Sequence, residues 1–152
     1  MLVTSHVLAG ALIGRALGRH PLGAFAAGVV SHFAMDACPH WGSAGVAMDE
    51  EFMRVARCDG CCGLAALAVA AGLSSKESRR AVAAAMIGGA VVDADKPLLH
   101  FFGWNPFPGP VRRFHQRIQN EAPHRLPYEV ATAGVLGVLA VAVLGGGRLR
   151  GD

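Results

Sequence analysis

Residues 130–147, VATAGVLGVLAVAVLGGG, decide the predicted fold, because this stretch of 18 residues contains no charged side chain. A run of about 18 or more apolar residues is typical of a transmembrane helix. Within residues 135–144 every position around a helix is apolar, so no polar stripe would face water. A chain of 152 residues contains too little protein to surround such a helix completely, so we expect lipid around it.

Working outward from this stretch, charged residues divide the rest of the chain into four shorter apolar blocks. Residues 64–72 are again apolar on all sides, whereas a soluble helical bundle, the alternative, should show a polar stripe every three to four residues. The shorter blocks approach the lower limit of a membrane span, about 17 residues, when a polar residue or two is added at their ends. We therefore predict an all-α fold, a single domain (residues 1–152) that forms an integral membrane bundle of about five short helices, at residues 1–14, 21–35, 60–75, 81–92 and 130–147.

The composition agrees with a membrane protein, since 53% of the residues are hydrophobic, only 16% are charged and 20 are glycine. The net charge is +3 and no basic run exceeds two residues, so we expect no nucleic-acid partner. Cys58 and Cys61 form one C-x-x-C pair, without the second pair that a zinc ribbon requires. We interpret them as small apolar residues at the start of a helix, or as a redox pair if they face an oxidising compartment.

The connectors between the blocks are of two kinds. Residues 15–20 and 76–80 are short and basic, whereas residues 40–59 and 93–129 are long and hold nearly all the acidic residues and prolines. The positive-inside rule applies to short loops, so we place the short connectors in the cytoplasm and the long ones on the extracytoplasmic side.

The last connector contains an aromatic and proline-rich run, residues 101–110, FFGWNPFPGP, which we expect not to be helical. The aromatic rings suit an interfacial belt, and a plain turn is the alternative. After this run, residues 111–121 are predicted to form a short helix with Arg112 and Arg113 on its polar side.

The segment with the most chemical information is SHFAMDACPHW, residues 31–41. Helical spacing of four places His32 and Asp36 on one face, and His40 follows near the same side. An imidazole and a carboxylate one turn apart can give two ligands to a divalent metal. Because ionisable residues at the end of an apolar segment are costly, we interpret this pair as functional.

Further ionisable residues are predicted at the same end of an up-and-down bundle, whereas His20 falls in the opposite, basic connector and is a negative control. A buried histidine can also be a hydrogen-bonded core residue, Asp95 can instead pair with Lys96, and arginines at this level can simply face headgroups. The residues gathered at the predicted site end are His6, Asp59, Asp93, Asp95, His115 and His124.

Four segments, SHVLAGALIG at residues 5–14, SHFAMDACPHW, DADKP at residues 93–97 and FHQRIQ at residues 114–119, resemble small bacterial membrane proteins described as inner-membrane metal-dependent hydrolases. They are more distantly similar to the helical metal site of zinc-dependent phospholipase C. The resemblance implies a bacterial inner-membrane location, with His40 near the metal and Gly42 where a carboxylate is expected. It implies as metal-site positions His6, His32, Asp36, Asp93 and His115.

Mixed histidine and aspartate ligands suit Zn or Mn. The corresponding function is a membrane-bound metal-dependent hydrolase acting on a phosphoester or lipid-linked substrate, with His40 or Asp95 as general base or acid. Arg112 or Arg113 would neutralise a substrate phosphate. The alternatives are a non-catalytic membrane protein with a structural or transported metal, and an interaction subunit that needs a partner.

Overall fold

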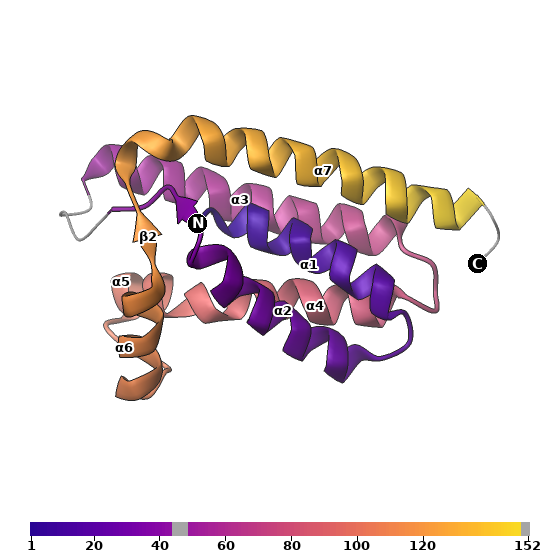
Figure 1. Ribbon diagram of the computed structural model, residues 1–152, viewed down its shortest axis with the longest axis horizontal. Helices are drawn as coiled ribbons and strands as arrows, with labels where there is room; N and C mark the ends of the chain where they lie inside the picture. The colour runs from indigo at the N-terminus through magenta and orange to yellow at the C-terminus, as the bar shows by residue number, and fades with distance from the viewer. Residues whose placement is uncertain (44–48, 150–152) are drawn as a thin grey trace.

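The computed structural model describes residues 1–43 and 49–149, and helices make up most of this part of the chain. The all-α prediction is confirmed, and each predicted apolar block overlaps one long helix. Parts of the predicted connector 40–59 and of the C-terminal tail, residues 44–48 and 150–152, lie outside the described residues. The long helices run up and down (Figure 1) and are α1 (Val3–Leu17), α2 (Pro21–Asp36), α3 (Glu50–Leu73), α4 (Arg79–Val91) and α7 (Leu126–Leu149).

Helices α1, α2 and α4 pack closely because small residues line their contacts. A Cβ atom on Gly10 of α1 would lie only 2.6 Å from the carbonyl oxygen of Ala85 in α4, and one on Gly28 of α2 would collide with the same carbonyl. Ala24, Ala81 and Ala85 are completely buried between these helices. Such close backbone approach is possible only where side chains are very small.

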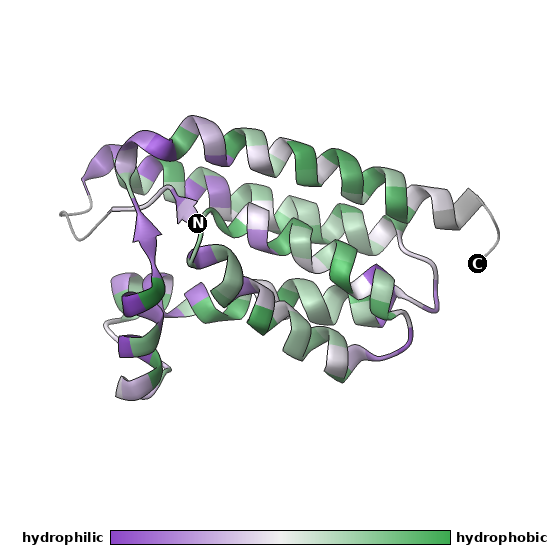
Figure 2. Cartoon of the chain, viewed as in Figure 1, coloured by the Kyte–Doolittle hydropathy of each residue, from purple (hydrophilic) through white to green (hydrophobic). Residues whose placement is uncertain are grey.

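Helices α3 and α7 pack against α1 and leave most of their apolar surface exposed. The hydropathy colouring shows that α7 is apolar along most of its length (Figure 2). Two stretches, Glu50–Leu73 and Pro123–Gly146, are long and apolar enough to cross a membrane, and only 11% and 17% of their most apolar windows are buried. A core helix of a soluble protein would be mostly buried. Within the described residues the structure thus supports two candidate spans, whereas five were predicted.

Short elements close one end of the bundle. After α4 come η1 (Val92–Ala94) and α5 (Asp95–Phe102), and then α6 (Gly109–Ile118), which runs crosswise to the long helices (Figure 1). A two-residue strand, β1 (Pro39–His40), pairs in parallel with β2 (Asn120–Glu121), so that His40 is opposite Glu121. The turn η2 (Pro123–Arg125) then leads into α7. This strand pair was not predicted from the sequence, and it connects the segment after α2 to the segment after α6.

Helix α3 begins ten residues earlier than the apolar pattern predicts, at Glu50 and not at residue 60. The side chain of Asp49 caps this helix by accepting a hydrogen bond from the Phe52 backbone N–H at 2.8 Å. Cys58 and Cys61 are therefore inside α3, and they are exposed, which contradicts their interpretation as buried apolar residues at a helix start.

The run of residues 101–110 is only partly non-helical, in contrast to the prediction. Phe101 and Phe102 form the end of α5, which stops at Gly103 in the left-handed conformation. Helix α6 already begins at Gly109, because Pro110 lies in its first turn, where the missing N–H costs nothing. Both aromatic residues are exposed, so the predicted interfacial role stays a prediction.

Candidate metal centre

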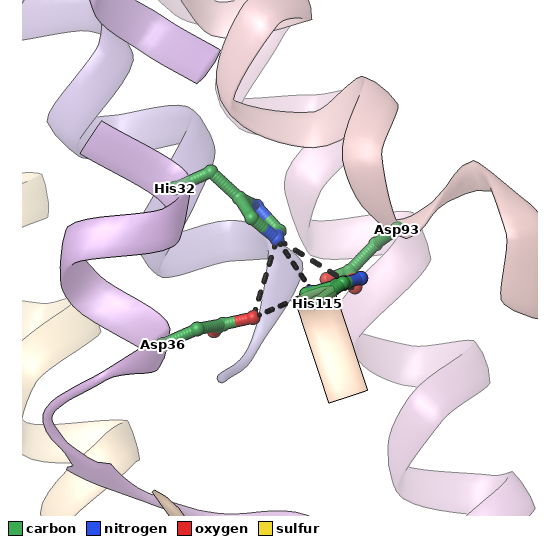
Figure 3. A group of neighbouring side chains, drawn as sticks. All are labelled: His32, Asp36, Asp93 and His115. Atoms are coloured by element: carbon green, nitrogen blue, oxygen red, sulfur yellow. Dashed lines mark hydrogen bonds and ion pairs between the residues drawn. The ribbon is translucent and has the colours of Figure 1, made fainter. Parts of the chain in front are cut away.

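Four buried side chains from three different elements meet at the end of the bundle: His32 and Asp36 of α2, Asp93 of η1 and His115 of α6. Each offers one ligand atom, and these atoms all lie within 4.8 Å of one another. Figure 3 shows the side chains pointing toward a common centre. This group could hold a metal ion, since imidazole and carboxylate are common ligands of divalent cations.

The ring of His32 is held in one orientation by the backbone of α4. Its Nδ1–H donates to the carbonyl oxygen of Gly89 at 2.7 Å, since a carbonyl can only accept. In the neutral ring Nε2 is then an acceptor, and it lies 3.2 Å from Oδ2 of Asp36 and 3.1 Å from Nε2 of His115. A hydrogen bond from the far ring nitrogen to a carbonyl is the usual support of a metal-binding histidine.

His115 is brought to this group by α6, which is strongly amphipathic. Its Nε2 lies 2.9 Å from Oδ2 of Asp36, and the ring is buried although its neighbours Phe114 and Arg112 are exposed. Gln119, one turn further along, contacts the same nitrogen at 3.1 Å through its Nε2. Gln119 was not among the predicted site residues, although its spacing of four from His115 is a signal present in the sequence.

Asp93 is charged at neutral pH despite its burial. Its Oδ1 lies 2.9 Å from Nζ of Lys96 and 3.9 Å from Nε2 of both His32 and His115. Burial raises the pKa of this carboxyl, but the Lys96 ammonium and the rings of His32 and His6 outweigh burial and hold the pKa at about 2. Lys96 thus pairs with Asp93, whereas the sequence suggested a pair with Asp95.

His6 and His40 lie on the other side of Asp36. Nε2 of His6 is 3.2 Å from Oδ1 of Asp36, and its ring stacks on that of His32 with 4.0 Å between centroids. The amino group of Met1 also contacts Oδ1, at 3.1 Å. Nε2 of His40 is 3.9 Å from the same oxygen. The structure therefore brings together all five predicted metal positions and the predicted neighbour His40.

The other sequence candidates have different surroundings. Asp59 accepts hydrogen bonds from the backbone N–H groups of Val3 and Thr4, at 2.6 and 3.1 Å, and so supports the start of α1. Oδ2 of Asp95 contacts the amide of Asn105 at 3.5 Å. The remaining candidates have exposed side chains: His20, in the connector at the opposite end, Arg112, Arg113 and His124.

Comparisons with protein-family models, with curated proteins and with solved structures gave no match. Function is therefore inferred from the geometry of the site.

Proposed function

We propose that this protein is a membrane-bound metal-dependent hydrolase that acts on a phosphoester or lipid-linked substrate. The observation that carries the proposal is the buried group of His32, Asp36, Asp93 and His115 at one end of a bundle whose long helices expose apolar surface. Two imidazoles and two carboxylates suit Zn or Mn. When bound, such an ion would polarise a phosphoryl oxygen and lower the pKa of water toward about 7.

The chain's own residues supply a fixed ligand set and a charged rim. Gly89 orients His32, and Asp36 lies in contact with both ligand histidines. Arg112 and Arg113 lie on the exposed side of the helix that buries His115, which places their guanidinium groups on the outside of the same end. A phosphate arriving from the headgroup layer would be neutralised there.

Neither of the two residues predicted to act as general base or acid, His40 and Asp95, has a solvent-accessible position that suits proton transfer. Asp95 lies beside Asn105. His40 is completely buried, and its Nε2 faces two carboxylate oxygens, those of Asp36 and Glu121, at 3.9 Å each. This position suits a cation ligand better than a group that accepts a proton from solvent.

The test combines metal analysis with turnover on protein purified in mild detergent. We expect a bound divalent metal and metal-dependent hydrolysis of members of a phospholipid and lipid-linked phosphoester panel. His32→Ala and Asp36→Ala should lose both properties, whereas His20→Ala, at the opposite end, should keep both. Retention of metal without turnover on the whole panel would reject the hydrolase and leave a metal-binding protein.

A non-catalytic polar network is the second candidate, because two cationic groups already contact the carboxylates. Lys96 lies 2.9 Å from Asp93, and the Met1 amino group lies 3.1 Å from Asp36. If these cations are the permanent partners, purified protein will contain no divalent metal, and a chelator will leave its unfolding temperature unchanged. If a metal is resident, the chelator will lower that temperature.

A further inference from the structure

The two oxygens of Asp36 face different sets of histidines. Oδ2 lies 2.9 Å from His115 and 3.2 Å from His32, inside the four-residue group described above. Oδ1 lies 3.2 Å from Nε2 of His6 and 3.9 Å from Nε2 of His40. A carboxylate placed in this way can bridge two cations, with one on each oxygen.

His40 has the properties of a ligand on the second side. Its Nδ1–H donates to the carbonyl oxygen of Cys38 at 2.8 Å, so in the neutral ring Nε2 carries the lone pair. This nitrogen is buried without a hydrogen-bond partner, and the side chain is 0% exposed. Oδ1 of Asp36 and Oε1 of Glu121 are each 3.9 Å away. The Met1 amino group already contacts Oδ1 at 3.1 Å, whereas the lone pair of His40 faces the Asp36 and Glu121 carboxylates across 3.9 Å, where a bound cation would stabilise all three groups.

The strand pair fixes the position of Glu121 in this arrangement. His40 and Glu121 are direct partners in the β1–β2 register, and the Ala122 N–H donates to the His40 carbonyl at 3.0 Å. A Cβ atom on Gly42 would collide with the Glu121 carboxyl group, so the glycine leaves the space that this carboxylate fills. The two short strands therefore place the imidazole of His40 beside the carboxylate of Glu121, which lies 81 positions later in the sequence.

We propose that the site is binuclear, with a second divalent cation held by His6, His40, Glu121 and Oδ1 of the bridging Asp36. This inference rests on the four-residue metal site proposed above. Paired cations about 3.5–4 Å apart are typical of enzymes that cleave phosphate esters, because the two ions can stabilise the attacking and leaving oxygens together. A binuclear site therefore favours a phosphoester over a carboxylic ester as the substrate class.

The first test is metal stoichiometry. Protein of residues 1–152 with a C-terminal tag, which leaves the Met1 amino group free of a tag, is dialysed against Zn²⁺ in detergent and analysed by mass spectrometry. We expect two Zn²⁺ per chain in the wild type, one in His40→Gln and in Glu121→Gln, and none in Asp36→Ala. The matched controls His124→Gln and Glu51→Gln, which alter exposed residues, should keep two. Circular dichroism checks that each variant is folded.

A second test needs no variant. Wild-type protein loaded with Mn²⁺ should give an exchange-coupled electron paramagnetic resonance spectrum, since a shared carboxylate couples two neighbouring ions. One ion per wild-type chain and an uncoupled six-line spectrum would overturn the binuclear site and leave the single site standing. No bound ion at all would overturn the proposed metal-dependent function as well.

Discussion

The same small residues serve opposite purposes in two regions of the molecule. In the layer of α1, α2 and α4, glycines stand where a neighbouring backbone leaves no room for a side chain: a Cβ on Gly89 would lie 2.8 Å from the His6 carbonyl oxygen. In α3 and α7, Gly72 and Gly134 would gain a Cβ without meeting any atom within 4 Å. The glycines at these contacts serve close packing, and Gly72 and Gly134 lie on an exposed surface, although Gly63 of α3 is buried against Val3.

This difference separates the part that holds the site from the part that faces the surroundings. The close-packed layer supplies His6 and His32, and the Gly89 carbonyl that orients His32 belongs to it as well. Tight backbone contact fixes these groups to within the tolerance that a metal site requires. The outer pair, α3 and α7, supplies an apolar surface with few constraints on each position.

The largest effect is expected from a charged residue introduced into the exposed apolar surface of α3 or α7. Val135, near the middle of the apolar stretch of α7, is 61% exposed. In a bilayer, Val135→Arg should cost roughly 2.5–3.5 kcal/mol of insertion free energy, whereas on a surface facing water it should change stability by about 0.5 kcal/mol or less. Membrane fractionation and an insertion assay measure the difference, with Val135→Leu as the control. Unchanged partition of the arginine variant would show that α7 does not face lipid.

A smaller effect is expected when glycines of the two regions are replaced by alanine and the stabilities of the two variants are compared. Gly28→Ala adds a Cβ that collides with the Ala85 carbonyl, so the backbones of α2 and α4 must separate, at a cost of about 1–3 kcal/mol. Gly134→Ala meets open space and should be neutral or stabilise its helix by up to about 1 kcal/mol. Thermal unfolding in detergent gives both values. Equal destabilisation by the two substitutions would mean that the glycines of α7 are contact positions too.

Much of the fold could be predicted because apolar blocks interrupted by charge mark the long helices. The start of α3 could not, since Glu50, Glu51, Arg54 and Arg57 give its first turns a polar composition. Its N-terminus depends on the Asp49 cap, a local hydrogen bond that hydropathy does not detect. Two of the five predicted spans are supported as candidate spans, whereas α1, α2 and α4 are shorter, with 15, 16 and 13 residues.

The site could be predicted as far as it depends on topology. His6, His32, Asp36 and Asp93 lie at helix ends that an up-and-down bundle must bring together. The contacts of Glu121 and Lys96 could not be predicted, because they depend on the path of η1, α5 and β2 across the end of the bundle. No spacing in the sequence specifies that path.

The smallest expected effect concerns charge, and it compares the buried Asp93 with the exposed ion pair of Arg19 and Glu77 at the opposite end. Because the pKa of Asp93 is held at about 2, below its ordinary value of 3.8, its charge stabilises the fold at neutral pH, and this stabilisation is lost as the pH falls from about 4 toward 2.

Lys96→Met removes the strongest influence that lowers this pKa. In metal-free protein it should lower stability at pH 6 by about 1 kcal/mol or less, since the half-exposed ammonium is screened by solvent, and the difference from wild type should shrink as the pH falls toward 2. The control is Glu77→Gln, which breaks the fully exposed pair with Arg19 at the opposite end and should leave the unfolding temperature unchanged. A constant difference between Lys96→Met and wild type from pH 6 to pH 2 would show that Lys96 acts through packing and not through the charge of Asp93.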